Sequence, residues 1–224
     1  MNSKQLMNHQ FDLPTSTVEA KVGGSGDQFS SSLRVELETK RIILRPAQHS
    51  DLPQIYGLIS DPANAYRWRY LGDLPPIEVF SNTVNENIIV QFAICSKKQP
   101  SRVHGILVCY NGDFRNGHAY IGILMGSNWH GIGLGMEAIG LFIRYLFHTW
   151  PFRKLYFETT ENNFGQFSSG MGRLFEIEGR LKRHVYVDGQ YCDLLLCAIT
   201  RELFETVIEP KINRLIRKAK ERRN

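Results

Sequence analysis

One stretch combining an apolar run, a glycine-rich turn and a helical pattern constrains this chain more than any other. The apolar run begins at Ile121 and ends in three alternating glycines, Gly131, Gly133 and Gly135, and an apolar pattern with helical spacing follows from Ala138. Glycine lets a ligand approach the backbone closely, and a helix N-terminus offers free N–H groups and partial positive charge. The stretch therefore predicts a strand, a loop and a helix with an anion site suited to a pyrophosphate. A plain glycine turn ahead of a core helix is the alternative.

Two other phosphate-binding motifs do not fit this stretch. No Gly-Lys-Ser/Thr follows the glycines, so the lysine and the hydroxyl of a P-loop are missing. The glycines are spaced G-x-G-x-G, and the acidic residue that a dinucleotide site needs about 20 residues further on is not at the end of a strand. Tyr156 to Glu158 lie there instead, inside the next expected strand.

Length and composition indicate one globular domain with tails. A chain of 224 residues is long enough to bury a substantial core. No apolar run reaches the roughly 20 residues that span a bilayer, and the N-terminus lacks the apolar segment of a secretory signal, so we expect a cytoplasmic protein. The cysteines contain no CxxC pair and lie in apolar runs, which indicates buried free thiols rather than a zinc site. They are Cys95, Cys109, Cys192 and Cys197. We expect no metal.

The net charge of +5 is concentrated at the C-terminus. Residues 210–224 carry seven Lys or Arg and one Glu, so the rest of the chain is near neutral. Apolar residues within this segment form a helical stripe, which predicts a basic amphipathic helix over 201–224 that docks on the domain or forms a dimer. Binding of an anionic membrane or nucleic acid is the alternative, and we do not expect nucleic acid as the main partner.

The remaining pattern predicts an α+β fold. Residues 1–38 are polar, with a linker-like run over 23–32, and indicate a flexible extension. Short loops between the early strands imply antiparallel neighbours, and the strand–helix–strand passage around the glycines implies one parallel pair. The expected strands cover 39–47, 90–96, 103–110, 118–125, 154–158, 179–187 and 191–200, and the expected helices cover 51–60, 77–85, 135–148 and 164–175. The result is a central, mostly antiparallel twisted sheet flanked by helices.

Two sets of residues resemble a known family. His130-Gly-Ile-Gly-Leu-Gly135 is similar to the Arg/Gln-x-x-Gly-x-Gly/Ala signature of the GNAT acetyltransferase superfamily, with His130 in the Arg/Gln place. Glu158, Asn163 five residues later and the long ending Glu178–Asp193 resemble the RimJ/RimL-like branch. The order of the expected elements is also that of the GNAT fold. The resemblance covers residues 39–200, which we take as the acyltransferase domain.

This resemblance implies a CoA-dependent N-acyltransferase. Acetyl-CoA would be the co-substrate, and its acetyl group would pass directly to a primary amine in a ternary complex. The glycine loop would bind the pyrophosphate, and backbone groups of the preceding strand would hold pantetheine and polarise the thioester. Asn163 would meet the pantetheine arm, with a helix N-cap as its alternative role. The donor-binding residues implied are Ile123, Leu124, Met125, His130, Gly131, Ile132, Gly133, Leu134, Gly135, Met136 and Asn163.

Few side chains are needed for the chemistry. Attack requires a neutral amine, so a base must remove a proton, and the developing oxyanion needs a donor. Glu158 is the first candidate base, and a solvated or salt-bridged glutamate is the alternative. A histidine side chain can serve as a base near neutral pH, so His184 is a second candidate base unless it is structural. Gly170 stands where the family places a Tyr, so the acid is either unnecessary or another residue, such as Tyr191 or Tyr186.

The acceptor is not identified by the sequence. Arg67, Trp68 and Arg69 lie where the family places substrate-binding loops and favour an acidic or aromatic acceptor, or else they cap the core. A small-molecule amine and a protein N-terminus both fit. Two other functions remain open: a CoA-binding module that has lost catalysis, and an acyltransferase that uses a longer acyl-CoA or the thioester of an acidic carrier protein. Both a monomer and a homodimer are compatible with the sequence.

Overall fold

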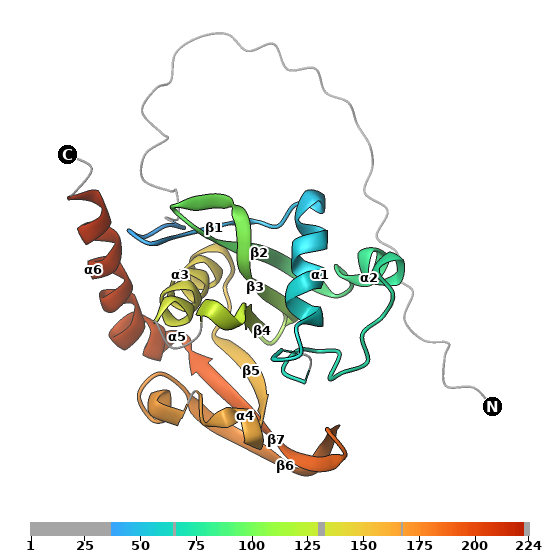
Figure 1. Ribbon diagram of the computed structural model, residues 1–224. Coiled ribbons are helices and arrows are strands. Elements are labelled where there is room, and N and C mark those ends of the chain that lie inside the picture. The colour runs from blue at the N-terminus through green and yellow to red at the C-terminus, as the bar shows by residue number, and fades with distance from the viewer. Residues whose placement is uncertain (1–36, 65, 130–132, 167, 222–224) are drawn as a thin grey trace, which may run out of the picture. The chain divides into compact units, whose positions relative to one another are not determined.

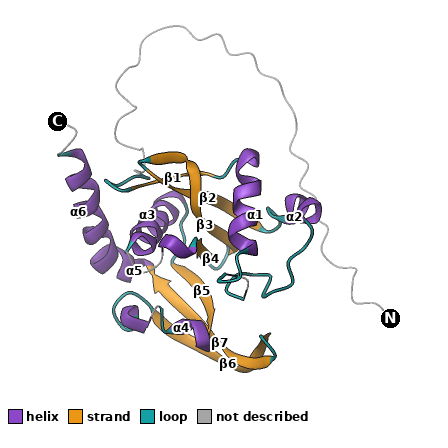
Figure 2. Ribbon diagram, viewed as in Figure 1, coloured by secondary structure: helices purple, strands orange, loops and turns teal. Residues whose placement is uncertain are grey.

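The computed structural model describes residues 37–64, 66–129, 133–166 and 168–221. Within these residues the chain forms a seven-stranded sheet with helices on both faces (Figures 1 and 2). The strands are β1 (Ile42–Pro46), β2 (Ile88–Ser96), β3 (Gln99–Asp113), β4 (His118–Met125), β5 (Lys154–Thr160), β6 (Glu176–Val187) and β7 (Gln190–Thr200). The helices are α1 (Leu52–Ser60), α2 (Ile77–Thr83), α3 (Leu134–Thr149), α4 (Glu161–Phe164), α5 (Arg201–Leu203) and α6 (Glu209–Lys220).

The sheet confirms the predicted fold class. Its strand order is β1-β2-β3-β4-β5-β7-β6, and every neighbouring pair is antiparallel except β4 and β5. The parallel pair is joined by α3, as the strand–helix–strand pattern predicts. The extension expected over 1–38 lies almost entirely outside the described residues.

The two parallel strands separate soon after they pair. Their register runs only from His118 opposite Lys154 to Tyr120 opposite Tyr156. Both strands then continue, β4 to Met125 and β5 to Thr160, without pairing to each other. In Figure 1, β5, β7 and β6 diverge from the part of the sheet that holds β1 to β4. The sheet therefore opens in its middle.

Each face of the sheet has its own apolar core. Successive side chains of a strand point to opposite faces, so Leu107 and Cys109 of β3 belong to one core and Ile106 and Val108 belong to the other. The first core includes the buried face of α3 and the buried residues of α6, and the second includes α1 and Phe80 of α2. The split sheet lies between these two layers.

The helix predicted over 164–175 is wrong. Only α4 precedes Gly165, and a 3-10 turn (Ser168–Gly170) follows. Glycines weaken a helix interior, and Gly172 has φ 69°, which no right-handed helix allows. Asn163 is also not the N-cap that we considered, because Thr160 occupies that position and Asn163 lies within α4.

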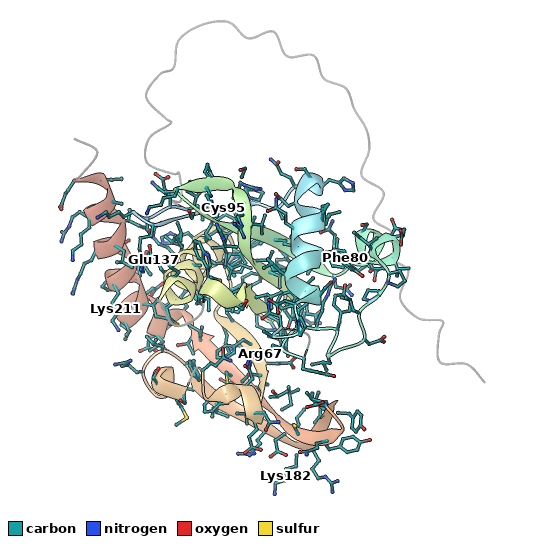
Figure 3. The ribbon with its side chains drawn as sticks, viewed as in Figure 1. Arg67, Phe80, Cys95, Glu137, Lys182 and Lys211 are labelled. Carbon is teal, nitrogen blue, oxygen red and sulfur yellow. The ribbon has the colours of Figure 1, made fainter. Side chains whose placement is uncertain are left out.

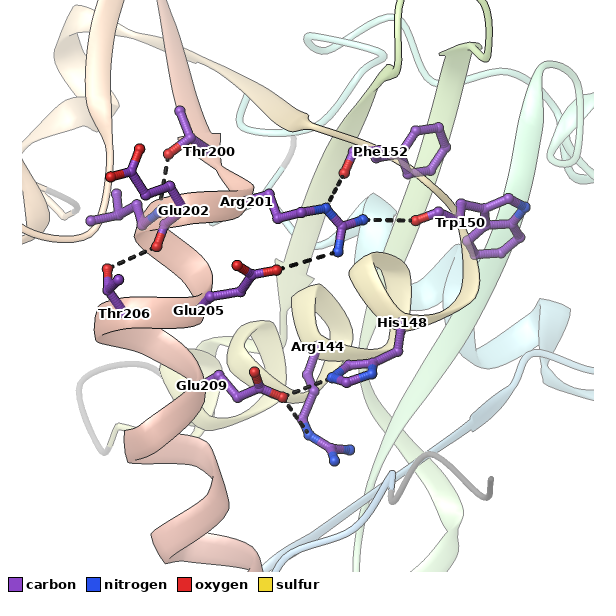
Figure 4. Close-up of polar contacts among 11 residues, drawn as sticks. Arg144, His148, Trp150, Phe152, Thr200, Arg201, Glu202, Glu205, Thr206 and Glu209 are labelled. Atoms are coloured by element: carbon purple, nitrogen blue, oxygen red, sulfur yellow. Dashed lines mark hydrogen bonds and ion pairs between the residues drawn. The ribbon is translucent and has the colours of Figure 1, made fainter. Parts of the chain in front are cut away.

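Hydrogen bonds and ion pairs join the C-terminal helical segment to the end of α3 and to the residues that follow it. After α5, a π-helical turn (Phe204–Ile208) leads into α6. Arg201 donates hydrogen bonds to the carbonyls of Phe152 at 2.8 Å and Trp150 at 3.0 Å (Figure 4). Glu209 lies 2.7 Å from Nε2 of His148 and also forms an ion pair with Arg144. These contacts fix where α6 begins.

No helix within the described residues is long and apolar enough to cross a membrane.

Candidate functional site

A cleft of about 1090 Å³ opens where β4 and β5 separate. Ile121, Gly122 and Ile123 line it from β4, and residues 157–160 line it from β5. Its walls come from both faces of the sheet, since Ile143 of the first core and Trp68 of the second both border it. The cleft therefore runs through the sheet, and ligands entering from opposite faces would meet at the gap.

The start of α3 borders this cleft. Gly133 is the N-cap residue, with φ 75°, and it lines the cleft together with Met136. A left-handed φ favours glycine, which explains this residue. Leu134 is buried in the core, and Gly135 packs near Met125 rather than lining the cleft. His130, Gly131 and Ile132 lie outside the described residues.

An ion pair that the sequence did not indicate lies beside this helix start. Glu137, in the first turn of α3, is 5% exposed and accepts hydrogen bonds from Thr39 Oγ1 and, at 2.9 Å, from Arg41 Nε. Arg41 and Glu137 both line the cleft. The guanidinium of Arg41 would lie 4.0 Å from a Cβ built on Gly133. The contact therefore places a guanidinium, paired with the carboxylate of Glu137, beside the predicted anion site.

Asn163 presents a hydrogen-bond acceptor at the cleft. Its Nδ2 donates to Thr159 Oγ1 at 3.2 Å, while its Oδ1 is buried and has no partner among the described residues. The residue lines the cleft. Burying a polar atom without a hydrogen bond is costly, so this oxygen is suited to a donor supplied by a ligand.

The three β4 residues predicted to bind pantetheine through their backbone have side chains in different surroundings. Ile123 lines the cleft, whereas the side chain of Leu124 is buried in the core on the α1 face and that of Met125 in the core on the α3 face. The carbonyl of Met125 accepts a hydrogen bond from Asn64 at 3.2 Å. Since β4 has no pairing with β5 beyond Tyr120, backbone groups on that edge face the cleft.

Glu158 lies exposed on β5 and lines the cleft. Tyr110 also lines it and was missed by sequence reasoning, because nothing local marks a strand tyrosine as functional. Burial, and then the charge of Glu158, raise the pKa of Tyr110 to about 12. The same two causes raise the pKa of Tyr120. Both phenols therefore stay protonated at neutral pH and can donate hydrogen bonds beside the carboxylate.

The β6–β7 hairpin contributes unevenly to the cleft. His184 and Tyr186 line it, whereas Tyr191 is 59% exposed, lies outside the lining and packs against Tyr186 at a ring distance of 5.1 Å. Gly170, where the family has a Tyr, is buried, and a Cβ there would lie 2.8 Å from the ring of Phe175. No side chain fits at that position without moving Phe175.

Arginines from the segment between α1 and α2 border the cleft. Arg67 and Arg69 both line it. Arg69 donates to the carbonyl of Val84 at 3.2 Å and lies over the ring of Tyr70. Trp68 is buried in the core and also borders the cleft.

The cysteines are free and buried, as predicted. Burial raises the pKa of Cys109 to about 12 and that of Cys197 to about 11, so neither is a reactive thiolate. Within the described residues no group of His, Cys, Asp or Glu could hold a metal ion.

The sheet, with its split parallel strand pair beside a glycine-capped helix, has the fold of solved acetyltransferases. The family model for the acetyltransferase (GNAT) domain matches residues 41–168, which is more than half of the chain. The chain belongs to the GNAT acetyltransferase family. The resemblance read from the glycine loop and the hairpin ending is thereby confirmed at the level of the family.

Among curated proteins, the chain is 34% identical over 83 residues to [ribosomal protein uS5]-alanine N-acetyltransferase of Escherichia coli (strain K12). This match spans 36% of the chain and 42% of that relative. The chain therefore matches only about two fifths of the length of its curated relatives.

Two solved structures show the same fold. One is spermidine N-acetyltransferase from Vibrio cholerae in complex with CoA and spermine, with a TM-score of 0.63 and 17% identity over 74% of this chain and 98% of that one. The other is RimL, a ribosomal L7/L12 alpha-N-protein acetyltransferase in complex with CoA, with a TM-score of 0.63 and 19% identity over 74% of this chain and 97% of that one.

Proposed function

We propose that this protein is a CoA-dependent N-acyltransferase that passes acetyl from acetyl-CoA directly to a primary amine in a ternary complex. The observation that carries this proposal is the cleft through the sheet at the β4–β5 gap, bordered by the buried, unpartnered Oδ1 of Asn163. A donor on one face and an acceptor on the other would bring thioester and amine together in the gap.

The donor side follows from the groups that border the cleft. The amide N–H groups of pantetheine are suited to Asn163 Oδ1 and to the unpaired backbone edge of β4 at Ile123. The pyrophosphate is suited to the start of α3 at Gly133, where the helix end and Arg41 both favour negative charge. The remaining loop residues, His130 to Ile132, are part of the same proposal.

The reaction needs one proton transfer before bond making. Glu158, directly or through a water, would accept a proton from the acceptor ammonium. The amine nitrogen then attacks the thioester carbonyl carbon, a C–N bond forms and the C–S bond breaks, and CoA leaves as a thiolate that takes up the second proton, which the nitrogen loses as the amide forms. Tyr110, protonated beside Glu158, can donate a hydrogen bond to the developing negative charge. His184 is the second candidate base in the cleft.

Tyr191 has an indirect role in this scheme. It lies outside the cleft lining and touches Tyr186, which borders the cleft. As the structure stands, Tyr191 would support Tyr186 and the hairpin rather than donate a proton. A CoA thiolate is a fair leaving group, so transfer does not depend on a dedicated acid.

We propose a protein N-terminus or a small-molecule amine as the acceptor, in the cytoplasm. Relatives with these activities are named for ribosomal proteins and for spermidine. An acidic carrier protein that delivers a longer acyl group is a further candidate partner, because the C-terminal helix is basic.

Turnover tests the proposal. The full chain would be incubated with acetyl-CoA and pooled amines comprising N-terminal peptides, polyamines and amino acids. A colorimetric thiol assay would measure released CoA, and mass spectrometry would identify the acetylated product. We expect thiol release that depends on one amine class. Parallel reactions with butyryl-CoA and longer thioesters report the acyl chain preferred.

One observation favours a second function, a CoA-binding module without catalysis. The ring of Phe175 fills the space beside Gly170, so the Tyr of the family has no counterpart there. This candidate predicts stoichiometric CoA binding with no thiol release from any thioester and amine pair. The same turnover assay, combined with calorimetry, separates the two functions.

A further inference from the structure

The C-terminal helix forms one wall of the cleft. Lys211 and Leu215 of α6 line it, facing Met136 and Ile139 of α3. This wall lies beyond residues 41–168, the part that matches the family model. The helix therefore borders the cleft although it lies outside the matched part of the chain.

The position of α6 is set by close packing. A Cβ built on Gly140 of α3 would lie 2.2 Å from Cδ1 of Ile212. A glycine at this point lets the two helices approach more closely than any other residue would. Ile212 itself is 5% exposed and belongs to the core. Lys211, the preceding residue, is thereby held at the rim of the cleft, at the end of α6 nearest α5 (Figure 3).

This end of the cleft is positively charged. Its cationic residues are Arg41, Arg173 and Lys211. The buried Glu137 pairs with Arg41, so these two charges offset each other, and Arg173 and Lys211 supply the excess positive charge. Arg173 donates to the carbonyl of Ser169 at 3.2 Å. Because a carbonyl is neutral, this contact does not offset the charge of the guanidinium.

The other acids of the cleft lie elsewhere. Glu158 shares the face of the sheet that carries Tyr110 and Tyr120, and Glu86 follows α2 on the same face. The end formed by α3, α6 and the turn before β6 therefore offers cations and an apolar surface. Such a site suits a phosphate attached to an aromatic base.

We propose that Lys211, with Arg173, binds the 3′-phosphate of CoA, and that the C-terminal helix thereby selects the complete nucleotide over donors that lack this phosphate. The inference rests on the proposed function. If the pyrophosphate lies at Gly133 and pantetheine lies in the gap, the nucleoside leaves the gap on the α3 side. That side is walled by α6, where Leu215 provides apolar contact one turn from Lys211.

Calorimetry with CoA and with 3′-dephospho-CoA tests this inference at low ionic strength. The full chain would be compared with Lys211→Ala and with Arg214→Ala. Arg214 lies on the same helix and is exposed, but it does not line the cleft, so it controls for the loss of one charge. Thermal unfolding of each variant reports whether the helix remains docked.

We expect Lys211→Ala to weaken CoA binding about 5- to 30-fold, to leave 3′-dephospho-CoA within about twofold, and to leave unfolding unchanged. Arg214→Ala should change both ligands by less than about twofold. An equal loss for both ligands in Lys211→Ala, or an equal loss of CoA affinity in Arg214→Ala, would overturn the inference. If CoA binds tightly and Lys211→Ala does not alter its affinity, the inference about Lys211 is overturned while the proposed function stands. Failure of the unaltered chain to bind either ligand contradicts the proposed function as well.

Discussion

The rings of Tyr120 and Tyr156 lie 5.4 Å apart at the last position where β4 and β5 pair. Directly beyond them the strands separate and the cleft begins. Glu178 of β6 fixes the position of Tyr156. The Tyr156 hydroxyl donates to its carboxylate at 3.0 Å, and Lys154 donates to the same carboxylate at 2.6 Å. The tyrosine pair therefore marks where the sheet is closed, and Glu158, two residues beyond Tyr156 on β5, lies on its open side.

The first prediction concerns the base. Glu158→Gln keeps the size of the side chain and removes its ability to accept a proton, so we expect kcat to fall about 10²- to 10⁴-fold. Affinity for CoA, measured by calorimetry, should change by less than about threefold, because the donor contacts lie elsewhere. Steady-state thiol release with the identified amine provides the rates.

Glu176→Gln is the matched control for this variant. Glu176 is exposed on β6 and does not line the cleft. A rate for Glu158→Gln equal to that of Glu176→Gln would remove Glu158 as the base and turn attention to His184.

The second prediction concerns Asn163. Asn163→Ala removes the buried oxygen that we assign to the pantetheine arm, and it should raise the dissociation constant of CoA about 5- to 30-fold. Asn162→Ala is the control, because Asn162 contacts Cys192 and does not line the cleft. Calorimetry on both variants compares them directly, and an equal effect of the two substitutions would contradict the assignment.

The third prediction concerns the packing of α6. Gly140→Ala should destabilise the fold by about 1–3 kcal/mol, because its methyl group would displace Ile212. In the background of Ile212→Ala, which by itself should cost about 2–4 kcal/mol, the same substitution should be neutral or stabilising, since alanine favours helices over glycine. Urea unfolding of the four proteins gives the coupling between the two sites. Additive effects would mean that the helices do not meet at this point.

The fourth prediction concerns pH and the link between β1 and the start of α1. The Arg45 guanidinium donates two hydrogen bonds to Asp51, at 2.7 and 2.8 Å, and lowers the pKa of that buried carboxyl. Its stabilisation is therefore present above the unfolded pKa of about 3.9 and is lost as the pH falls through the lower folded pKa. Asp51→Asn should cost about 1–3 kcal/mol at pH 7.

That cost should shrink progressively below about pH 4, because the unaltered chain then protonates the same carboxyl. Urea unfolding at pH 7 and pH 3 measures the difference. A cost that is the same at both pH values would show that the ion pair does not contribute through its charge.

Local patterns were sufficient for much of the fold. The strand predicted over 118–125 has those bounds in the structure. The Asp188-Gly189 turn has φ 48° and 78°, the left-handed values that its two residues tolerate, and it joins β6 to β7 as predicted. In each case neighbouring residues determine the conformation.

Contacts between distant segments were not visible in the sequence. Arg41 and Glu137 are 96 positions apart, and nothing near either residue marks the pair. In the sequence, Lys211 is indistinguishable from the other lysines of the basic C-terminal segment. In the structure, the packing of Ile212 on Gly140 places it at the cleft. The segment 164–175 was misjudged because its glycines allow turns that helical spacing alone does not exclude.

The central claim, that the cleft binds the acyl donor, is tested most directly by titrating acetyl-CoA into the full chain in a calorimeter. We expect one molecule to bind per chain, with a dissociation constant on the order of micromolar to a few hundred micromolar. The absence of binding heat with acetyl-CoA at millimolar concentration, at several temperatures, would contradict it.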